Sequence, residues 1–130
     1  MNQNRRQILY VGPPDETARI VSERLQSAGY QVCSLNERAA APDLVRARYF
    51  DLYILSEEYS DENGLWLCRE LSSIDPRTPI LVCCNDTEGE KLRRFFQAGA
   101  RWCLRNPPDP WHLLSAAVRL ICFAETRPEG

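Results

Sequence analysis

Short apolar segments alternate with amphipathic segments along most of the chain. The apolar segments predict buried strands over residues 8–11, 30–35, 51–55, 79–84 and 100–104. After each of them, apolar residues recur at helical spacing and predict helices over 15–28, 42–49, 64–74, 88–98 and 109–125. Strands with unbroken apolar runs, each followed by a helix, are typical of a parallel sheet that helices cover on both faces.

Local signals support the predicted boundaries. Gly29 and Gly99 are expected to end two of the helices, Pro42 suits a first helical turn, and Asp109 is expected to cap the last helix. The fourth helix is predicted to bury Leu92, Phe95 and Phe96 and to expose Lys91, Arg93 and Arg94. In a sheet of this kind the chemistry lies at the carboxyl ends of the strands. The loops to examine are therefore 12–16, 56–61, 84–87 and 105–108.

Composition limits the possible functions. The chain has 130 residues, which predicts one domain, with a core over about 7–124 and flexible termini. The net charge of −2 argues against nucleic-acid binding. No signal peptide or membrane-spanning run is visible, so a cytoplasmic location without membrane association is expected. A single histidine, His112, excludes a multi-histidine metal site, and His112 itself is expected at the surface or in a helix cap.

Six cysteines are present, and no two of them have the C-x-x-C spacing of a zinc or redox motif. They lie at positions 33, 68, 83, 84, 103 and 122. Four of them stand in apolar runs, where a free thiol behaves as a small hydrophobic side chain. A reducing compartment is the simplest interpretation.

Several anchors in the chain resemble those of a response-regulator receiver domain, the flavodoxin-like module of two-component signalling. These anchors are Ile8-Leu9-Tyr10-Val11, Ala28-Gly29-Tyr30-Gln31-Val32, Phe50-Asp51-Leu52-Tyr53-Ile54-Leu55, Gly64, Pro76-Arg77-Thr78-Pro79-Ile80, Gln97-Ala98-Gly99-Ala100-Arg101 and Asn106-Pro107. The resemblance implies a flavodoxin-like (βα)5 three-layer sandwich, with a five-stranded parallel sheet of order 2-1-3-4-5.

The residues that carry receiver chemistry are missing. The resemblance places the two metal-holding acids at Gly12 and Pro13, the phosphate-accepting aspartate at Ser56, the strand-four hydroxyl at Cys84, the strand-five aromatic at Cys103 and the lysine at Asn106. Glycine and proline offer Mg²⁺ no side-chain oxygen, and the metal is usually anchored by carboxylates. Because Lys91 falls on the fourth helix with its side chain expected outward, no lysine is expected near this degenerate pocket.

These losses predict a pseudo-receiver, a protein–protein interaction module in two-component-type signalling. Aspartate phosphorylation, enzymatic activity, a metal and any other cofactor are not expected. The expected partner is a histidine kinase, another regulator or a second copy of the chain. Receivers resembling this one bind partners through the fourth helix, fifth strand and fifth helix. Residues expected there are Lys91, Arg94, Arg101, Trp102, Arg105 and Trp111. The competing interpretation is a solvated helix face.

Other functions stay open. A displaced acidic site could accept a phosphoryl group through Asp15 or Glu57, although solvated loop carboxylates explain Asp15, Glu16, Glu57, Glu58 and Asp61 more simply. Cys84 and Cys103 could form a redox sensor, although two buried thiols filling space is the simpler interpretation. Ser56 could be a kinase target or a small polar strand end. A small molecule could also bind at the strand ends.

Overall fold

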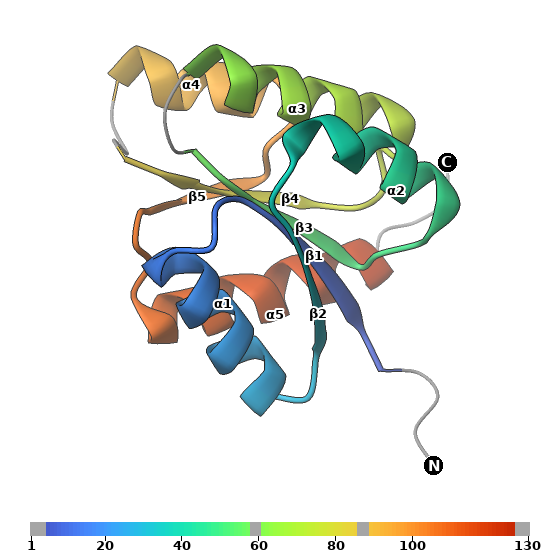
Figure 1. The fold of residues 1–130 in the computed structure, drawn as a ribbon, viewed down its shortest axis with the longest axis vertical. Coiled ribbons are helices and arrows are strands. Elements are labelled where there is room, and N and C mark those ends of the chain that lie inside the picture. Colours follow the sequence, from blue (N-terminus) through green and yellow to red (C-terminus); the bar gives the residue numbers. More distant parts are fainter. Residues whose placement is uncertain (1–4, 58–60, 86–88, 127–130) are drawn as a thin grey trace.

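The polypeptide folds into three layers, with a parallel sheet between two layers of helices (Figure 1). The computed structural model describes residues 5–57, 61–85 and 89–126. The strands are β1 (Gln7–Val11), β2 (Gln31–Leu35), β3 (Leu52–Ser56), β4 (Ile80–Cys84) and β5 (Trp102–Arg105). The helices are α1 (Glu16–Ser27), the 3-10 turn η1 (Arg38–Ala40), α2 (Ala41–Ala47), α3 (Asp61–Ile74), α4 (Gly89–Gln97) and α5 (Pro110–Thr126). The sheet order is β2-β1-β3-β4-β5, which confirms the predicted fold class and topology.

Side chains of the central strands alternate between the two faces of the sheet, as the pleat requires. Val11, Leu55 and Val82 belong to the core cluster that also contains buried residues of α2, α3 and α4. Ile54 and Leu81 belong to the cluster that contains buried residues of α1 and α5. Figure 1 shows these two sets of helices on opposite sides of the sheet. Both faces are thus covered, which explains the unbroken apolar runs.

The predicted helix ends are largely confirmed. Gly29 and Gly99 follow α1 and α4 with φ angles of 99° and 120°, in the left-handed region that glycine adopts without strain. The Asp15 carboxylate accepts the N–H of Ala18 at 3.2 Å and caps α1. Asp109 Oδ2 accepts the N–H groups of Trp111 and His112, each at 3.0 Å, at the start of α5.

Some boundaries and orientations differ from expectation. β5 begins at Trp102 rather than Ala100, and α3 begins at Asp61, earlier than position 64. The prediction that Phe96 points inward is wrong, because its side chain is 40% exposed whereas Phe95 is fully buried. Successive helical residues are rotated by about 100°, so both phenylalanines cannot face the core equally. Of the termini expected to be flexible, residues 1–4 and 127–130 lie outside the described residues, whereas residues 125 and 126 belong to α5.

Candidate functional site

The carboxyl edge of the sheet brings together the positions that were predicted to form a degenerate pocket. Ser56 is paired with Cys83, and Cys84 with Arg105, in the parallel register. Gly12 directly follows β1, and its N–H donates to the carbonyl oxygen of Leu35 at 3.0 Å. Ser56 and Cys84 are both buried. Pro13 lies beside this group and is half-buried.

Tyr10 occupies the space next to Gly12. Tyr10 and Gly12 are two residues apart along β1 and its extension, so they share a face of the sheet. The Tyr10 side chain is fully buried. A Cβ atom added at Gly12 would lie 2.6 Å from Tyr10 Oη and 2.8 Å from Ser56 Cβ. The site therefore has no room for a larger residue at Gly12 unless its neighbours move.

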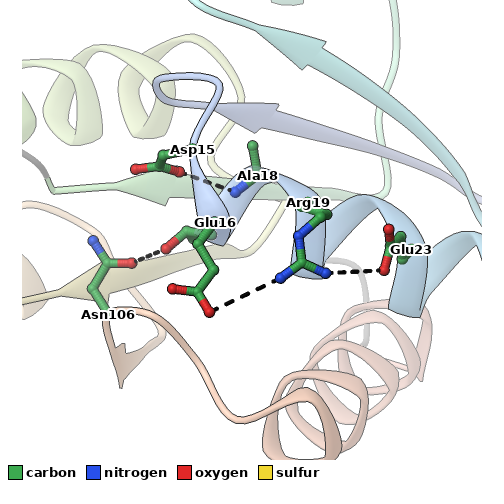
Figure 2. A network of polar contacts seen from close by, with 7 residues as sticks. Asp15, Glu16, Ala18, Arg19, Glu23 and Asn106 are labelled. Atoms are coloured by element: carbon green, nitrogen blue, oxygen red, sulfur yellow. Dashed lines mark hydrogen bonds and ion pairs between the residues drawn. The ribbon is translucent and has the colours of Figure 1, made fainter.

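Asn106 lies at the centre of a polar network at this edge. Its amide nitrogen donates to Ser56 Oγ at 3.3 Å, to the carbonyl oxygen of Glu57 at 3.2 Å and to Asn85 Oδ1 at 3.4 Å. Its amide oxygen accepts a hydrogen bond from the hydroxyl of Thr17, a buried residue of α1. Figure 2 shows Asn106 facing the first turn of this helix. The network joins β3, β4, α1 and the segment after β5 through neutral side chains.

A buried ion pair lies beside this network. Lys91 Nζ is 2.6 Å from Glu57 Oε2, and the side chains of Lys91 and Glu57 are 27% and 1% exposed. The other carboxylate oxygen, Oε1, accepts the N–H of Asn85 at 3.0 Å. The predictions that Lys91 points outward, that Glu57 is a solvated carboxylate and that no lysine lies nearby are therefore wrong. Lys91 reaches the edge of the pocket from α4 instead of from the position of Asn106.

Two of the other acids named as candidates, Asp15 and Glu16, make contacts on α1 instead. Asp15 caps α1, and Glu16 is exposed, with an oxygen 4.0 Å from the Arg19 guanidinium (Figure 2). Glu58 and the side chain of Asp61 lie outside what the structure describes. Within the described part of the chain, no group of three or more histidine, cysteine, aspartate or glutamate residues could hold a metal ion.

Cys84 and Cys103 lie on the neighbouring strands β4 and β5. All six cysteines are free thiols. The hydrogen bond between these two side chains, together with burial, raises the pKa of the Cys84 thiol. The register places Cys103 opposite Val82, two residues before Cys84. With strands about 4.8 Å apart and a rise of about 3.3 Å per residue, the two Cα atoms are roughly 8 Å apart. A disulfide needs Cα atoms within about 7 Å, so the backbone would have to move.

Two other thiols make stability depend on alkaline pH. Burial raises the pKa of Cys68 and of Cys83 to about 12. Below pH 9 each thiol is protonated in the folded and unfolded chain alike, whereas above pH 9 only the unfolded chain releases the proton. The free energy of unfolding is therefore expected to fall between pH 9 and 12, by roughly 1 kcal/mol per pH unit for each thiol.

Urea unfolding at several pH values under reducing conditions measures this loss. Cys83→Ala is expected to flatten the decline above pH 9, whereas Cys122→Ala, at an exposed position, is expected to leave it unchanged. An identical pH slope for wild type and Cys83→Ala would contradict the expectation.

The residues predicted for a partner face lie on or beside α4, β5 and the start of α5. Arg94, Trp102 and Arg105 are exposed and Arg101 is half-buried, on or beside α4 and β5. Trp102 also lines a cavity of about 410 Å³ between β5 and α5. Trp111 is 66% exposed, and its ring lies 5.9 Å from the Arg24 guanidinium carbon of α1. Lys91, on α4, forms an ion pair with the Glu57 carboxylate.

Three residues of the site were missed in the sequence. The sequence pattern predicts Tyr10 as a strand residue, Thr17 as a helix residue and Asn85 as a loop residue, and it predicts no site contact for any of them. The sequence did hold one signal, since Tyr10 stands two positions before Gly12 and must share its face. Thr17 carries no such signal, because its meeting with Asn106 spans 89 residues.

Comparison with known proteins assigns this chain to a protein family. The response regulator receiver domain model matches residues 8–118. The chain therefore belongs to the response-regulator receiver family, whose members act in two-component signalling and typically interact with histidine kinases and other signalling proteins. Among the described helices, none is long and apolar enough to cross a membrane.

Individual relatives agree with this assignment. The chain is 31% identical over 87 residues to the sensor histidine kinase AruS of Pseudomonas aeruginosa, covering 64% of this chain and 9% of the kinase. It is 25% identical over 119 residues to the alginate biosynthesis regulator AlgB of Pseudomonas syringae, covering 92% of this chain and 27% of AlgB. The chemotaxis protein CheY4 of Vibrio cholerae superposes with a TM-score of 0.79 at 26% identity, covering 89% of this chain and 98% of CheY4.

Proposed function

We propose that this chain is a pseudo-receiver, a protein–protein interaction module in two-component-type signalling that works without aspartate phosphorylation. It acts in the cytoplasm, catalyses no reaction and needs no Mg²⁺. The observation that carries this proposal is that the chain's own side chains fill the carboxyl edge of the sheet. Tyr10 fills the space beside Gly12, and Asn106 binds the hydroxyl of Ser56.

The chemistry of the edge supports the proposal. Gly12 and Pro13 offer no carboxylate to a hard divalent cation. A phosphoryl group brings about two negative charges, and the neutral amide of Asn106 does not compensate them. The Ser56 side chain is buried and bound to an amide rather than to a base that would activate it. Burial of Ser56 also argues against its modification by a serine kinase.

The alternatives receive less support. A displaced acceptor at Glu57 would have to give up its contacts with Lys91 and the Asn85 N–H. A redox sensor at Cys84 and Cys103 would need backbone movement as well as a thiolate that the raised pKa of Cys84 disfavours. The third alternative, a small molecule at the strand ends, would have to displace Tyr10 or Asn106.

The partner is proposed to be a histidine kinase, another regulator or a second copy of the chain, held mainly by protein contacts and not by nucleic acid. Exposed Arg94, Trp102 and Arg105 on or beside α4 and β5 support a contact there. Arginine and tryptophan are enriched among residues that dominate binding energy. The separation of Trp111 toward α1 limits the proposed surface to α4, β5 and the adjoining side of α5.

A titration tests the absence of phosphorylation. The ¹⁵N-labelled chain is mixed with Mg²⁺ to about 10 mM and then with beryllium fluoride, a phosphoryl mimic, while amide spectra are recorded. Neither addition is expected to produce a saturable shift at Gly12, Ser56 or Asn85, because Gly12 and Pro13 offer the cation no carboxylate and the Glu57 carboxylate is already bound by Lys91 and the Asn85 N–H. A receiver that carries the acidic pair and the acceptor aspartate serves as the positive control. Saturable shifts at these residues, or an acyl phosphate found by mass spectrometry after incubation with a small phosphodonor, would refute the proposal.

A further inference from the structure

The buried Glu57 carboxylate and the Lys91 ammonium connect the end of β3 to α4. Glu57 directly follows Ser56, and its backbone N–H donates to the carbonyl oxygen of Cys83 at 2.8 Å. The residue is therefore fixed by its backbone as well as by its carboxylate. Lys91 is the third residue of α4 and the only lysine in the chain. Figure 1 shows α4 beside α3 on one side of the sheet, with its start near the carboxyl edge.

The ion pair offsets an unfavourable positive charge at the start of α4. A cation in the first turn of a helix is opposed by the helix dipole, whereas an anion there is favoured. Glu57 supplies that anion from outside the helix and neutralises Lys91 at 2.6 Å. The carboxylate is almost completely shielded from water, so salt screens the attraction much less than it screens a surface pair.

A second contact between α4 and the core comes from Phe95. The helix has nine residues, a length that is marginal in isolation, and Phe95 is its one buried side chain. Phe95 contacts α3, where its ring carbon would lie 3.3 Å from a Cβ at Gly64. Lys91 and Phe95 are four residues apart and share a helix face. Within the described part of the chain, the Phe95 side chain and the Glu57–Lys91 ion pair both hold this face of the helix.

We propose that the Glu57–Lys91 ion pair is a built-in device that holds α4 against the carboxyl edge of the sheet without any phosphoryl group. The α4 surface that carries Arg93, Arg94 and Phe96 is then presented constantly to a partner. This inference rests on the proposed function, since it explains how a pseudo-receiver keeps a single arrangement of its interaction surface. A partner can shift the arrangement only by favouring the state in which the pair is broken.

Hydrogen exchange measured residue by residue tests the device. In Lys91→Met, amides of residues 91–97 are expected to exchange at least about tenfold faster than in wild type, while those of β1 and β3 change little. The matched control is Arg94→Met, which removes an exposed arginine of the same helix whose guanidinium lies 4.0 Å from Glu90. Arg94→Met is expected to change these rates by less than about threefold.

Two further variants keep the test decisive. Lys91→Arg keeps the charge and is expected to retain most of the α4 protection, even if Lys91→Met unfolds. Glu57→Gln/Lys91→Met is expected to protect α4 better than Lys91→Met, because no carboxylate is left buried without its cation. Equal α4 exchange in Lys91→Met and Arg94→Met would overturn the inference. These exchange measurements use no phosphodonor. Phosphorylation of the wild-type protein would therefore refute the proposed function, while the exchange rates of α4 would still test the role of the ion pair.

Discussion

Gly12→Asp, which introduces a carboxylate at the carboxyl edge of the sheet, is expected to destabilise the protein. Its Cβ would meet Tyr10 Oη at 2.6 Å and Ser56 Cβ at 2.8 Å, so one of these neighbours must move. Overpacking costs about 1–3 kcal/mol, and burial of an unpaired carboxylate adds to it. A loss of about 3 kcal/mol, or roughly 10 °C in Tm, is expected from urea and thermal unfolding.

A matched glycine substitution separates this clash from a general effect of adding a side chain. At Gly64, on α3, the nearest atom to an added Cβ is Phe95 Cζ at 3.3 Å, and alanine also favours the helix. Gly64→Ala is therefore expected to change stability by less than about 1 kcal/mol. Gly12→Ala should be costly alone and less costly in a Tyr10→Leu background, since the clash with the ring is gone and only the contact with Ser56 Cβ remains. A Gly12→Asp protein as stable as wild type would show that the site has spare room.

Lys91→Met is expected to lower the free energy of unfolding by about 3 kcal/mol, because it leaves the Glu57 carboxylate buried without its cation. The double variant Glu57→Gln/Lys91→Met is expected to cost less than Lys91→Met alone, since both charges are removed together. Urea unfolding of wild type, both single variants and the double variant measures this coupling at neutral pH.

The control for this cycle is again on α4. Arg94→Met breaks an exposed pair with Glu90 at 4.0 Å and is expected to cost less than about 1 kcal/mol. Additive costs in the cycle, or a Lys91→Met loss no larger than that of Arg94→Met, would mean that the buried contact contributes little to stability.

The architecture could be predicted from the sequence because the core strands are unambiguous. The apolar run 79–84 is too short for a typical helix and fits a strand buried on both faces, and β4 lies there at Ile80–Cys84. Glycines after α1 and α4 then fixed two helix ends through their backbone geometry. The start of β5, one of the two edge strands, is less clearly marked in the sequence. β5 has one unpaired side and two exposed residues, so its apolar pattern is weaker and its start was placed two residues too early.

The site could be predicted only in part. The positions of Gly12, Ser56, Cys84 and Asn106 were correctly grouped, since parallel strands end at one edge. The ion pair was missed because Lys91 was assigned outward by its charge, although it shares a helix face with Phe95. The burial of Glu57 and its pairing with Lys91 could not be predicted for a similar reason, since a carboxylate after a strand is usually solvated. Whether such groups pair depends on how far apart two elements lie in space, which residue type and spacing do not reveal.

The close packing of Tyr10, Gly12 and Ser56 limits the order in which mutations at this edge can accumulate. An acidic side chain at Gly12 would clash with Tyr10 and Ser56, so a single mutation there lowers stability before it gives any benefit. Smaller residues at Tyr10 would have to come first, and they would leave a hole in the core until the acid arrived. Each first step toward an acidic residue at this edge thus lowers stability, whichever of the two positions changes first.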